Sequence, residues 1–305
     1  MRVATLAQFN ATLSNIQDAQ ARTAEAQIKI SSGQKAQRYS GISGEARRLV
    51  SFEAAHLRTA RFMENNQRID GRLQIMETNI STIMDIATSL RADLISVGSG
   101  AGTGLQVDDT ASQLLREMAS LLNVSVEGRY LFGGGVTDRP PVDLDDPAFL
   151  PPGSTYPSAA DTAYYQGDST KLTTRADQNV EITYGMTADE PTFEKTIRAL
   201  HLTATAVSGD QVDQARIDEA LGLIGEAIDD LPDLIGRIGA TRRTLENVNA
   251  KHDDFQLYTE QTIADIEAAD ITLTLAQISE DSTVLEASYA TLGQLSRLSL
   301  LDYLR

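Results

Sequence analysis

Side chains that could carry out chemistry are few in this sequence, and their spacing does not suit catalysis or metal binding. The three histidines, His56, His201 and His252, stand alone, and none lies three or four residues from another histidine or within a metal-ligand motif. A lone histidine on a helix is more often structural or exposed than a ligand. Because the chain has no cysteine, it also lacks thiolate nucleophiles, disulfides and cysteine-bound zinc.

Acidic pairs and glycine clusters offer no better pattern. Adjacent carboxylates such as Asp229 and Asp230 point to different faces of a helix and cannot flank one bond. The glycines of 98–104 ("GSGAGTG") follow a helical segment, and no Lys-Ser or Lys-Thr pair follows them, so we interpret them as a turn rather than a phosphate loop. The run 143–146 lacks the glycine and glutamate of a calcium loop. We therefore predict no enzymatic activity and no catalytic, metal-binding or cofactor-binding residue.

The composition narrows the possible partners. The formal net charge is −17 and the sequence pI is about 4.5, whereas binding to a phosphate backbone needs basic patches. No apolar run approaches the roughly 18 residues of a membrane span. The first 15 residues lack the apolar core and cleavage site of a secretory signal. We expect no nucleic acid partner, no membrane insertion, and export, if it occurs, without a cleaved signal peptide.

Charge is unevenly distributed along the chain. Residues 1–60 carry eight Lys and Arg against four Asp and Glu, whereas residues 207–290 carry five against eighteen. The two segments could attract each other across a helix pair, or the acidic segment could simply form a solvated face. The sequence leaves both interpretations open.

Long helices must position whatever surface the protein uses. A heptad stripe in residues 1–30 becomes polar toward its end, and the glycines of 31–44 should interrupt that helix. A helix over 45–96 would be about 75 Å long, which predicts a rod. The stripes comprise Leu6, Phe9, Leu13, Ile16, Gln20, Thr23, Gln27 and Ile30, then Leu73, Met76, Ile80, Ile83, Ala87, Leu90 and Leu94.

Three further helix starts are predicted from capping residues. Asp108 or Asp109 is expected to cap a third helix that carries Leu114 to Leu122. Asp189 is expected to cap a fourth, with Pro191 in its first turn. Asp210 and Asp213 are spaced as a capping box for a fifth. Pro232 lies within that fifth helical pattern, whose apolar stripe runs from Ile217 to Ile238, and should kink or divide it.

These elements predict a mainly α fold, an elongated antiparallel helical bundle or coiled coil made from both chain ends, with a small β-rich insertion domain at the tip. Proline-rich and then alternating β-type residues over 136–190 give the insertion. The expected domains are a terminal coiled coil (1–40 with 265–305), a helical rod (41–130 with 190–264) and the β-rich insertion (131–189).

Several motifs spread over nearly the whole chain resemble one family. They are "KISSGQK" (29–35), "GRYLFGGGVTDRPPV" (128–142), "YQGDS" (165–169), "ITYGMTADEPTFEKTIRAL" (182–200), "GATRRTLENV" (239–248) and "SLLDYLR" (299–305). Together they resemble the flagellin-like axial proteins of the bacterial flagellum, most closely the hook-associated protein 3 (hook–filament junction) family. Tyr130, Leu131, Phe132 and Gly133 carry this likeness where bundle and insertion meet. One departure is "YSGISGEARRL" (39–49), where many members have a Ser-Asp-Asp-Pro-like stretch.

The resemblance implies a structural subunit that polymerises head to tail at the junction and connects hook to filament. In this family the two terminal segments fold together when subunits stack, so the terminal apolar residues would be assembly contacts: Leu6, Phe9, Leu13, Ile16, Leu285, Tyr289, Leu292, Leu295, Leu298 and Leu301. Implied partners are copies of the same chain, a neighbouring hook-associated protein on the hook side, flagellin or a junction partner on the filament side, and an export chaperone, with an extracellular location in the flagellum.

Two other functions stay open at this point. A flagellin, which forms the filament itself, would resemble this chain at both ends but usually lacks the "YLFGGG" and "YQGDS" pair. A helical adaptor or signalling coiled coil is the alternative of another class, and such a protein should not carry a proline-rich β insertion.

Overall fold

The computed structural model describes residues 2–98, 106–150, 156–208 and 211–303, with side chains described from 7 to 294 within these ranges. The chain divides into two compact units. Unit 1 comprises Met1–Arg58 and Asp254–Arg305, and unit 2 comprises Thr59–Asp253. Both units are mainly α, with short antiparallel strand pairs in unit 2, so the predicted fold class is confirmed. The three predicted domains stay a prediction.

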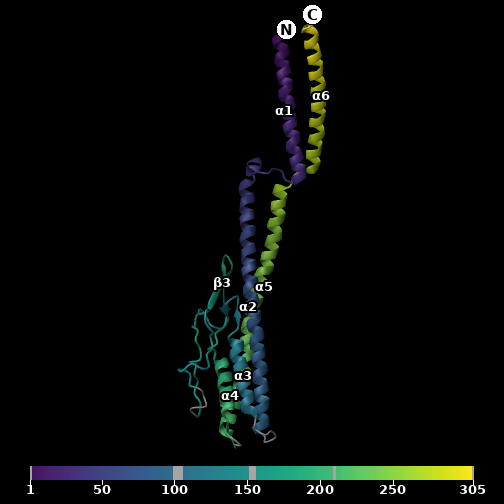
Figure 1. The fold of residues 1–305 in the computed structure, drawn as a ribbon. Coiled ribbons are helices and arrows are strands. Elements are labelled where there is room, and N and C mark those ends of the chain that lie inside the picture. The colour runs from purple at the N-terminus through teal and green to yellow at the C-terminus, as the bar shows by residue number, and fades with distance from the viewer. Residues whose placement is uncertain (1, 99–105, 151–155, 209–210, 304–305) are drawn as a thin grey trace. The chain divides into compact units, whose positions relative to one another are not determined.

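Unit 2 is built on four helices that run beside one another (Figure 1). They are α2 (Ala46–Gly98) and α5 (Gln214–Glu267), which both continue into unit 1, and the shorter α3 (Val107–Leu122) and α4 (Pro191–Ala204). The predicted heptad stripe of α2 is buried along this core, as are residues of α3 and α5 at the predicted spacing, including Leu115, Met118, Ile224 and Leu231. These central stripes therefore form the core of unit 2.

The start of α3 differs from its prediction. The helix begins at Val107, and Gln106 occupies the N-cap position without a side-chain hydrogen bond. Asp108 and Asp109 lie inside the first turn, so the predicted cap is wrong. Carboxylates in a first turn still favour the helix, because they lie near the positive end of its dipole. Of the predicted turn before α3, Gly98 ends α2, and 99–104 lie outside the described residues.

The starts of α4 and α5 match their predictions in part. Pro191 is in the first turn of α4 as predicted, but Glu190, not Asp189, holds the N-cap position, again without a side-chain bond. Asp213 caps α5, since its Oδ1 accepts hydrogen bonds from the Ala215 and Arg216 backbone nitrogens at 3.2 and 3.3 Å. Its predicted capping-box partner, Asp210, lies outside the described residues.

Pro232 does not divide α5, contrary to one of the two predicted outcomes. The helix runs unbroken from Gln214 to Glu267 with Pro232 inside it. Proline costs about 3 kcal/mol within a helix, through a lost hydrogen bond and a steric clash. Leu231 and Leu234, directly beside it, are buried in the core. Packing on both sides of the proline therefore outweighs the local cost.

The insertion contains less strand than its alternating residues suggested. Its regular part is the hairpin of β3 (Leu172–Asp177) and β4 (Val180–Tyr184), and most of 131–150 and 156–171 is irregular. A second hairpin, β1 (Ser125–Val126) with β2 (Arg129–Tyr130), precedes it. A third antiparallel strand pair, β5 (Val207–Ser208) with β6 (Gln211–Val212), lies before α5 and was not predicted from the sequence. Strands this short need neighbouring helices for stability.

Unit 1 places the two chain ends side by side. Helices α1 (Arg2–Ser32) and α6 (Ile271–Tyr303) run antiparallel, with the N- and C-termini at the same end of the pair (Figure 1). The predicted interruption after α1 is confirmed, with a 3-10 helix, η1 (Tyr39–Ile42), between α1 and α2. A second interruption at 268–270 separates α5 from α6. In the described part of the chain, no helix is long and apolar enough to cross a membrane.

Candidate assembly surface

The contact between α1 and α6 uses small side chains. Among the described side chains of α1 the buried ones are Ile16, Ala19 and Ala26, which lie three and then seven residues apart and so fall on one face of a heptad pattern. The facing positions of α6 are Thr274 and Asp281, both buried. Alanine and threonine allow the two backbones to approach closely but bury little apolar surface, so this seam alone contributes weak hydrophobic stabilisation.

A charge pair fixes the register of this seam. Arg22 Nη2 lies 2.7 Å from Asp281 Oδ1, and only 6% of the Asp281 side chain is exposed. Hydrogen bonding to Asp281 raises the pKa of Arg22. Gln20 Nε2 also donates to the Tyr289 hydroxyl at 2.7 Å. The contact joins the basic N-terminal segment to the acidic 207–290 segment, as one of the two charge interpretations expected.

Backbone hydrogen bonds join the two interruptions of unit 1. Lys35 N donates to Glu267 O at 2.7 Å, and Ala269 N donates to Gly33 O at 2.8 Å. Gly33 has φ of +70°, which glycine adopts at little cost. The end of α1 is thereby tied to the start of α6 as well as along the seam.

The predicted assembly residues fall into three groups. Ile16 is buried in the α1–α6 seam, and Phe9, Leu285 and Leu292 are half-buried. Leu13 and Tyr289 are 40% and 49% exposed. The side chains of Leu6, Leu295, Leu298 and Leu301 lie outside the described residues. Leu13 and Tyr289 are therefore the predicted contacts that the described part of unit 1 leaves open to a neighbouring molecule.

Exposed apolar side chains are concentrated in unit 1. Of its described apolar residues, only Ile16, Ala19, Ala26, Leu49 and Ile266 are buried, whereas unit 2 holds the rest of the core. The large hydrophobic residues that unit 1 exposes are Leu13, Ile28, Tyr39, Val50, Leu57, Phe255, Leu257, Tyr258, Ile271, Leu273, Leu275, Val284 and Tyr289. Unit 2 exposes three among its described residues, Ile95, Leu150 and Tyr156. Exposed apolar side chains concentrated in one part of a protein favour an interaction site there.

Three of the motifs behind the family resemblance meet in unit 2. Phe132 is fully buried, packs edge-on against Phe193 at 5.9 Å, and accepts a backbone bond from Ala188. Directly after it, Gly135 N donates to Asp168 Oδ1 at 2.7 Å. Hydrogen bonds from the Gly135 and Thr170 backbones lower the pKa of Asp168. The glycine run thus wraps around the aspartate of "YQGDS".

The remaining predicted motif residues join this loop to neighbouring backbone segments. Leu131 is buried and its nitrogen donates to Val124 O, while Tyr130 N donates to Thr137 O. Gly133 O accepts hydrogen bonds from Val136 N and Asp168 N, each at 3.3 Å. In this structure the motif packs the edge of the insertion against the rest of unit 2.

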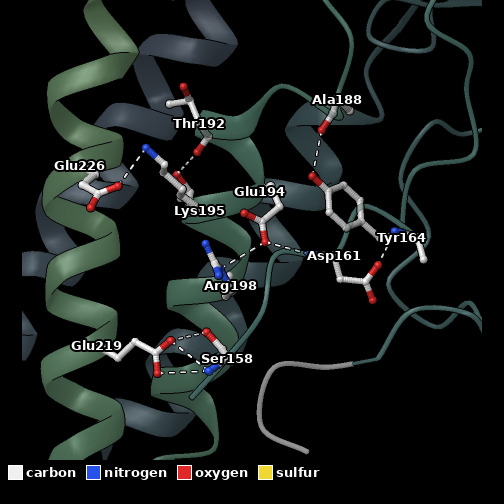
Figure 2. A network of polar contacts seen from close by, with 12 residues as sticks. Ser158, Asp161, Tyr164, Ala188, Thr192, Glu194, Lys195, Arg198, Glu219 and Glu226 are labelled. Atoms are coloured by element: carbon white, nitrogen blue, oxygen red, sulfur yellow. Dashed lines mark hydrogen bonds and ion pairs between the residues drawn. The ribbon is translucent and has the colours of Figure 1, made fainter. Parts of the chain in front are cut away.

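Figure 2 shows how the insertion is fastened to α4 and α5. Ser158 donates from both its nitrogen and its hydroxyl to Glu219 of α5. Asp161 N donates to Glu194 Oε1 of α4, which also pairs with Arg198 at 3.2 Å. Tyr164 is fully buried, and its hydroxyl donates to Ala188 O. The insertion therefore lies along the helices of unit 2 and is held by buried and partly buried polar contacts.

Burial is the main cause of the shifted pKa values of two titratable groups of α4. Burial raises the pKa of Glu194, although Arg198 opposes this shift. Burial lowers the pKa of His201 to about 4, and its ring lies 5.5 Å from that of Phe149. Of the three histidines that opened the sequence analysis, His56 contacts Thr259, and His252 contacts the carbonyl oxygen of Ala176 at 2.9 Å. The described residues contain no group of acidic or histidine side chains that could hold a metal ion.

Comparison of the fold relates the chain to flagellar proteins. A structure described as a flagellar hook-associated protein of Vibrio parahaemolyticus matches with a TM-score of 0.61 and 18% identity, covering 75% of this chain and 100% of that one. Flagellar hook-associated protein 3 of Legionella pneumophila matches with a TM-score of 0.54 and 13% identity, covering 71% and 98%. The chain has the fold of these hook-associated proteins. No protein-family model matches the sequence, and no curated protein does either.

Proposed function

We propose that this protein is a structural subunit of the bacterial flagellum that polymerises head to tail at the hook–filament junction and connects hook to filament. The concentration of exposed apolar side chains in unit 1 is the main support, because copies of the chain could cover that surface. The shared fold and the sequence motifs favour a hook-associated subunit. Ordering of the terminal helices would then be coupled to stacking.

The proposal includes a location and partners. The protein would be exported to the cell exterior by the flagellar route, with the help of a chaperone and without a cleaved signal. In the flagellum it would contact other copies of itself, a hook-associated protein on the hook side, and flagellin or a junction partner on the filament side.

Deletion of the gene tests this proposal against the filament alternative. We expect cells without the protein to carry intact hooks and to release flagellin into the medium, seen by electron microscopy and by immunoblotting of the supernatant. Bare hooks with no released flagellin would instead make the protein the filament subunit. Normal filaments would contradict both axial roles and favour an adaptor.

A further inference from the structure

The start of α2, in unit 1, carries a shallow hollow with two arginines on its rim. Its volume is about 570 Å³. We call it the basic hollow, and its lining residues are Ser43, Gly44, Arg47, Arg48, Ser51 and Phe52. Both arginines are exposed, and no acidic side chain lines the hollow. The site therefore combines positive charge with one aromatic wall.

Both arginines can still bind a carboxylate. Neither side chain forms a hydrogen bond or an ion pair with a described residue. Arg48 lies over the Phe52 ring, 5.6 Å from its centroid. This cation–π contact leaves N–H donors for a second partner, since a guanidinium group has five. A carboxylate accepts two such donors side by side, which gives a strong and directional contact.

An exposed aromatic cluster adjoins the basic hollow. Phe52 packs edge-on against Tyr258 with ring centroids 6.0 Å apart, and Tyr258 lies 6.4 Å from Phe255. Although these rings touch one another, 52% of Tyr258 and 39% of Phe255 are exposed. Tyrosine and arginine are enriched among the interface residues that contribute most to binding. A partner for this surface should present an apolar side chain beside a carboxylate.

One segment of the insertion offers both kinds of side chain. Between Arg139 and Lys171 the chain has five aspartates and no lysine, arginine or histidine. Residues 143–150, which we call the acidic segment, form turns and irregular backbone in this stretch. Asp143 and Asp145 are exposed there. Asp143 Oδ1 accepts a hydrogen bond from the Asp145 nitrogen at 3.0 Å, and the Asp145 carboxylate bonds to no described residue.

Leu150 ends the acidic segment as an outward-facing apolar side chain. It is the most exposed large hydrophobic residue among those described in unit 2, at 66%. Its backbone is nevertheless fixed, because its nitrogen donates to Asp161 Oδ2 at 3.0 Å. The preceding Phe149 is buried and packs edge-on against Tyr164 at 5.4 Å. The side chain is thus held in solvent by an ordered loop, where covering it would be favourable.

The basic hollow and the acidic segment match in charge and shape. A loop with an outward-facing leucine can enter a hollow more deeply than the flat side of a helix can, and opposite charges favour this orientation. We propose that the acidic segment of one copy docks in the basic hollow of a second copy. Its Asp145 pairs with Arg47 and Arg48. Its Leu150 packs against Phe52.

This contact deepens the proposed function and rests on it. The basic hollow belongs to unit 1 and the acidic segment to unit 2, so the interface joins unlike surfaces. Such a heterologous contact leaves one free hollow and one free segment on every pair of molecules, and it can continue into a helical array. Head-to-tail growth follows from the docking without any further partner.

Disulfide cross-linking tests this docking, since the chain has no cysteine of its own. Ser51→Cys lies in the basic hollow and Ala148→Cys in the acidic segment, and both positions are exposed. The two single variants are co-expressed in cells that lack the natural gene, and the isolated flagella are oxidised. A disulfide forms only where the two Cα atoms come within about 7 Å. We expect a dimer when both variants are present and none when either is expressed alone.

Ala240→Cys is the matched control, because it replaces another exposed alanine of unit 2 but lies on α5, outside the acidic segment. We expect it to give no dimer with Ser51→Cys. A dimer of Ser51→Cys alone would indicate a two-fold contact and overturn the proposal, as would equal cross-linking by the control. Incorporated protein without the 51–148 dimer would overturn the docking and leave the proposed function standing. Flagella that lack even the unsubstituted protein would overturn both.

Charge reversal provides a second measurement. Arg47→Glu with Arg48→Glu places like charges across the contact, and we expect about tenfold less incorporation into flagella, which corresponds to about 1.4 kcal/mol. Asp143→Arg with Asp145→Arg should lose as much. Combining all four changes in one chain should restore incorporation, because hollow and segment again carry opposite charges. Failure of the combined variant to exceed either parent, with unchanged circular dichroism of the monomers, would contradict the docking.

Discussion

At the scale of single residues, glycine is required for two different reasons. One is a left-handed backbone conformation, and the other is a close contact that leaves no room for a Cβ atom. Gly128 and Gly134 both have positive φ, +75° and +66°. A Cβ at Gly128 would meet nothing within 4 Å, whereas one at Gly134 would collide with the backbone oxygen of Asp168. The second glycine is therefore required by the contact between the glycine run and "YQGDS", and the first only by its turn.

Alanine substitutions should measure the free-energy cost of the backbone conformation and of the close contact separately. Gly128→Ala should destabilise unit 2 by about 1–2 kcal/mol, the cost of a left-handed conformation for a residue with a Cβ. Gly134→Ala should cost about 1–3 kcal/mol more, because the loop must also move away from Asp168. Urea unfolding followed by circular dichroism measures both. Equal losses for the two variants would mean that the close contact with Asp168 contributes nothing.

His201 should make unit 2 sensitive to acid. Its pKa is about 4 in the folded protein and about 6.5 when unfolded, so between these values the unfolded state binds more protons. Stability should therefore fall as the pH drops from 7 to 4, by up to about 3 kcal/mol. Urea unfolding at several pH values should show a weaker fall for His201→Leu. Glu194, whose pKa is raised by burial, acts with the opposite sign in both proteins, so the difference between them isolates His201.

At the scale of elements, α1 has one face that packs against α6 and another that is exposed. Ala19 is buried against α6, and Leu13 is 40% exposed. Ala19→Leu should overpack the seam and weaken the α1–α6 pair by about 1–3 kcal/mol. Leu13→Asp should leave that pair intact but reduce incorporation into flagella, since it places a charge on an intermolecular contact. Hydrogen exchange of α1 and the amount of protein in isolated flagella distinguish the two effects.

The opposite pattern would contradict this assignment of faces. Faster exchange of α1 in Leu13→Asp would mean that Leu13 holds the helix pair together. Normal incorporation of the same variant would remove Leu13 from the assembly surface. Asn10→Asp, which changes an exposed polar residue of the same helix, is the control for charge alone.

The same helix shows how far the sequence could predict the candidate site. The predicted stripe ran through Ile16, Gln20 and Gln27, and the structure buries Ile16 but places Ala19 and Ala26 in the seam instead of the two glutamines. The two stripes share every second position and differ by one residue at the others, so both satisfy a three-four spacing, and hydrophobicity favours the stripe with Leu13. Close approach to α6 instead selects the row with alanine. Which side chains remain for a neighbour depends on this choice, which only the partner helix decides.

The core of unit 2 was more predictable than its helix boundaries. Residues such as Leu73, Ile80 and Leu90 repeat strictly over many turns, and burial followed that repeat. The caps at Asp108 and Asp189 failed because a single side-chain hydrogen bond contributes only about 1 kcal/mol, so neighbouring contacts can displace it. The polar contacts of Ser158 and Glu219 link segments 61 residues apart, and no periodic signal marks such pairs.

At the scale of the whole molecule, the two units differ in how much apolar surface each buries by itself. Nearly the whole described core belongs to unit 2, and unit 1 buries five apolar residues while exposing most of the large ones. Conformational entropy must be offset by such burial. Unit 2 has the means to fold in an isolated chain, and in the proposed assembly unit 1 would gain most of its stabilisation from neighbouring copies.

Limited proteolysis should make this difference visible. In the monomer we expect trypsin to remove unit 1 first, because weakly packed segments open at little free-energy cost, and to leave a resistant fragment close to Thr59–Asp253. Mass spectrometry identifies its ends. In isolated flagella the same unit 1 sites, including Arg22, Lys29 and Arg47, should be protected, since neighbouring copies would cover them. Equal resistance of both units in the monomer would show that unit 1 is stable alone, and unprotected unit 1 sites in flagella would contradict its role in assembly.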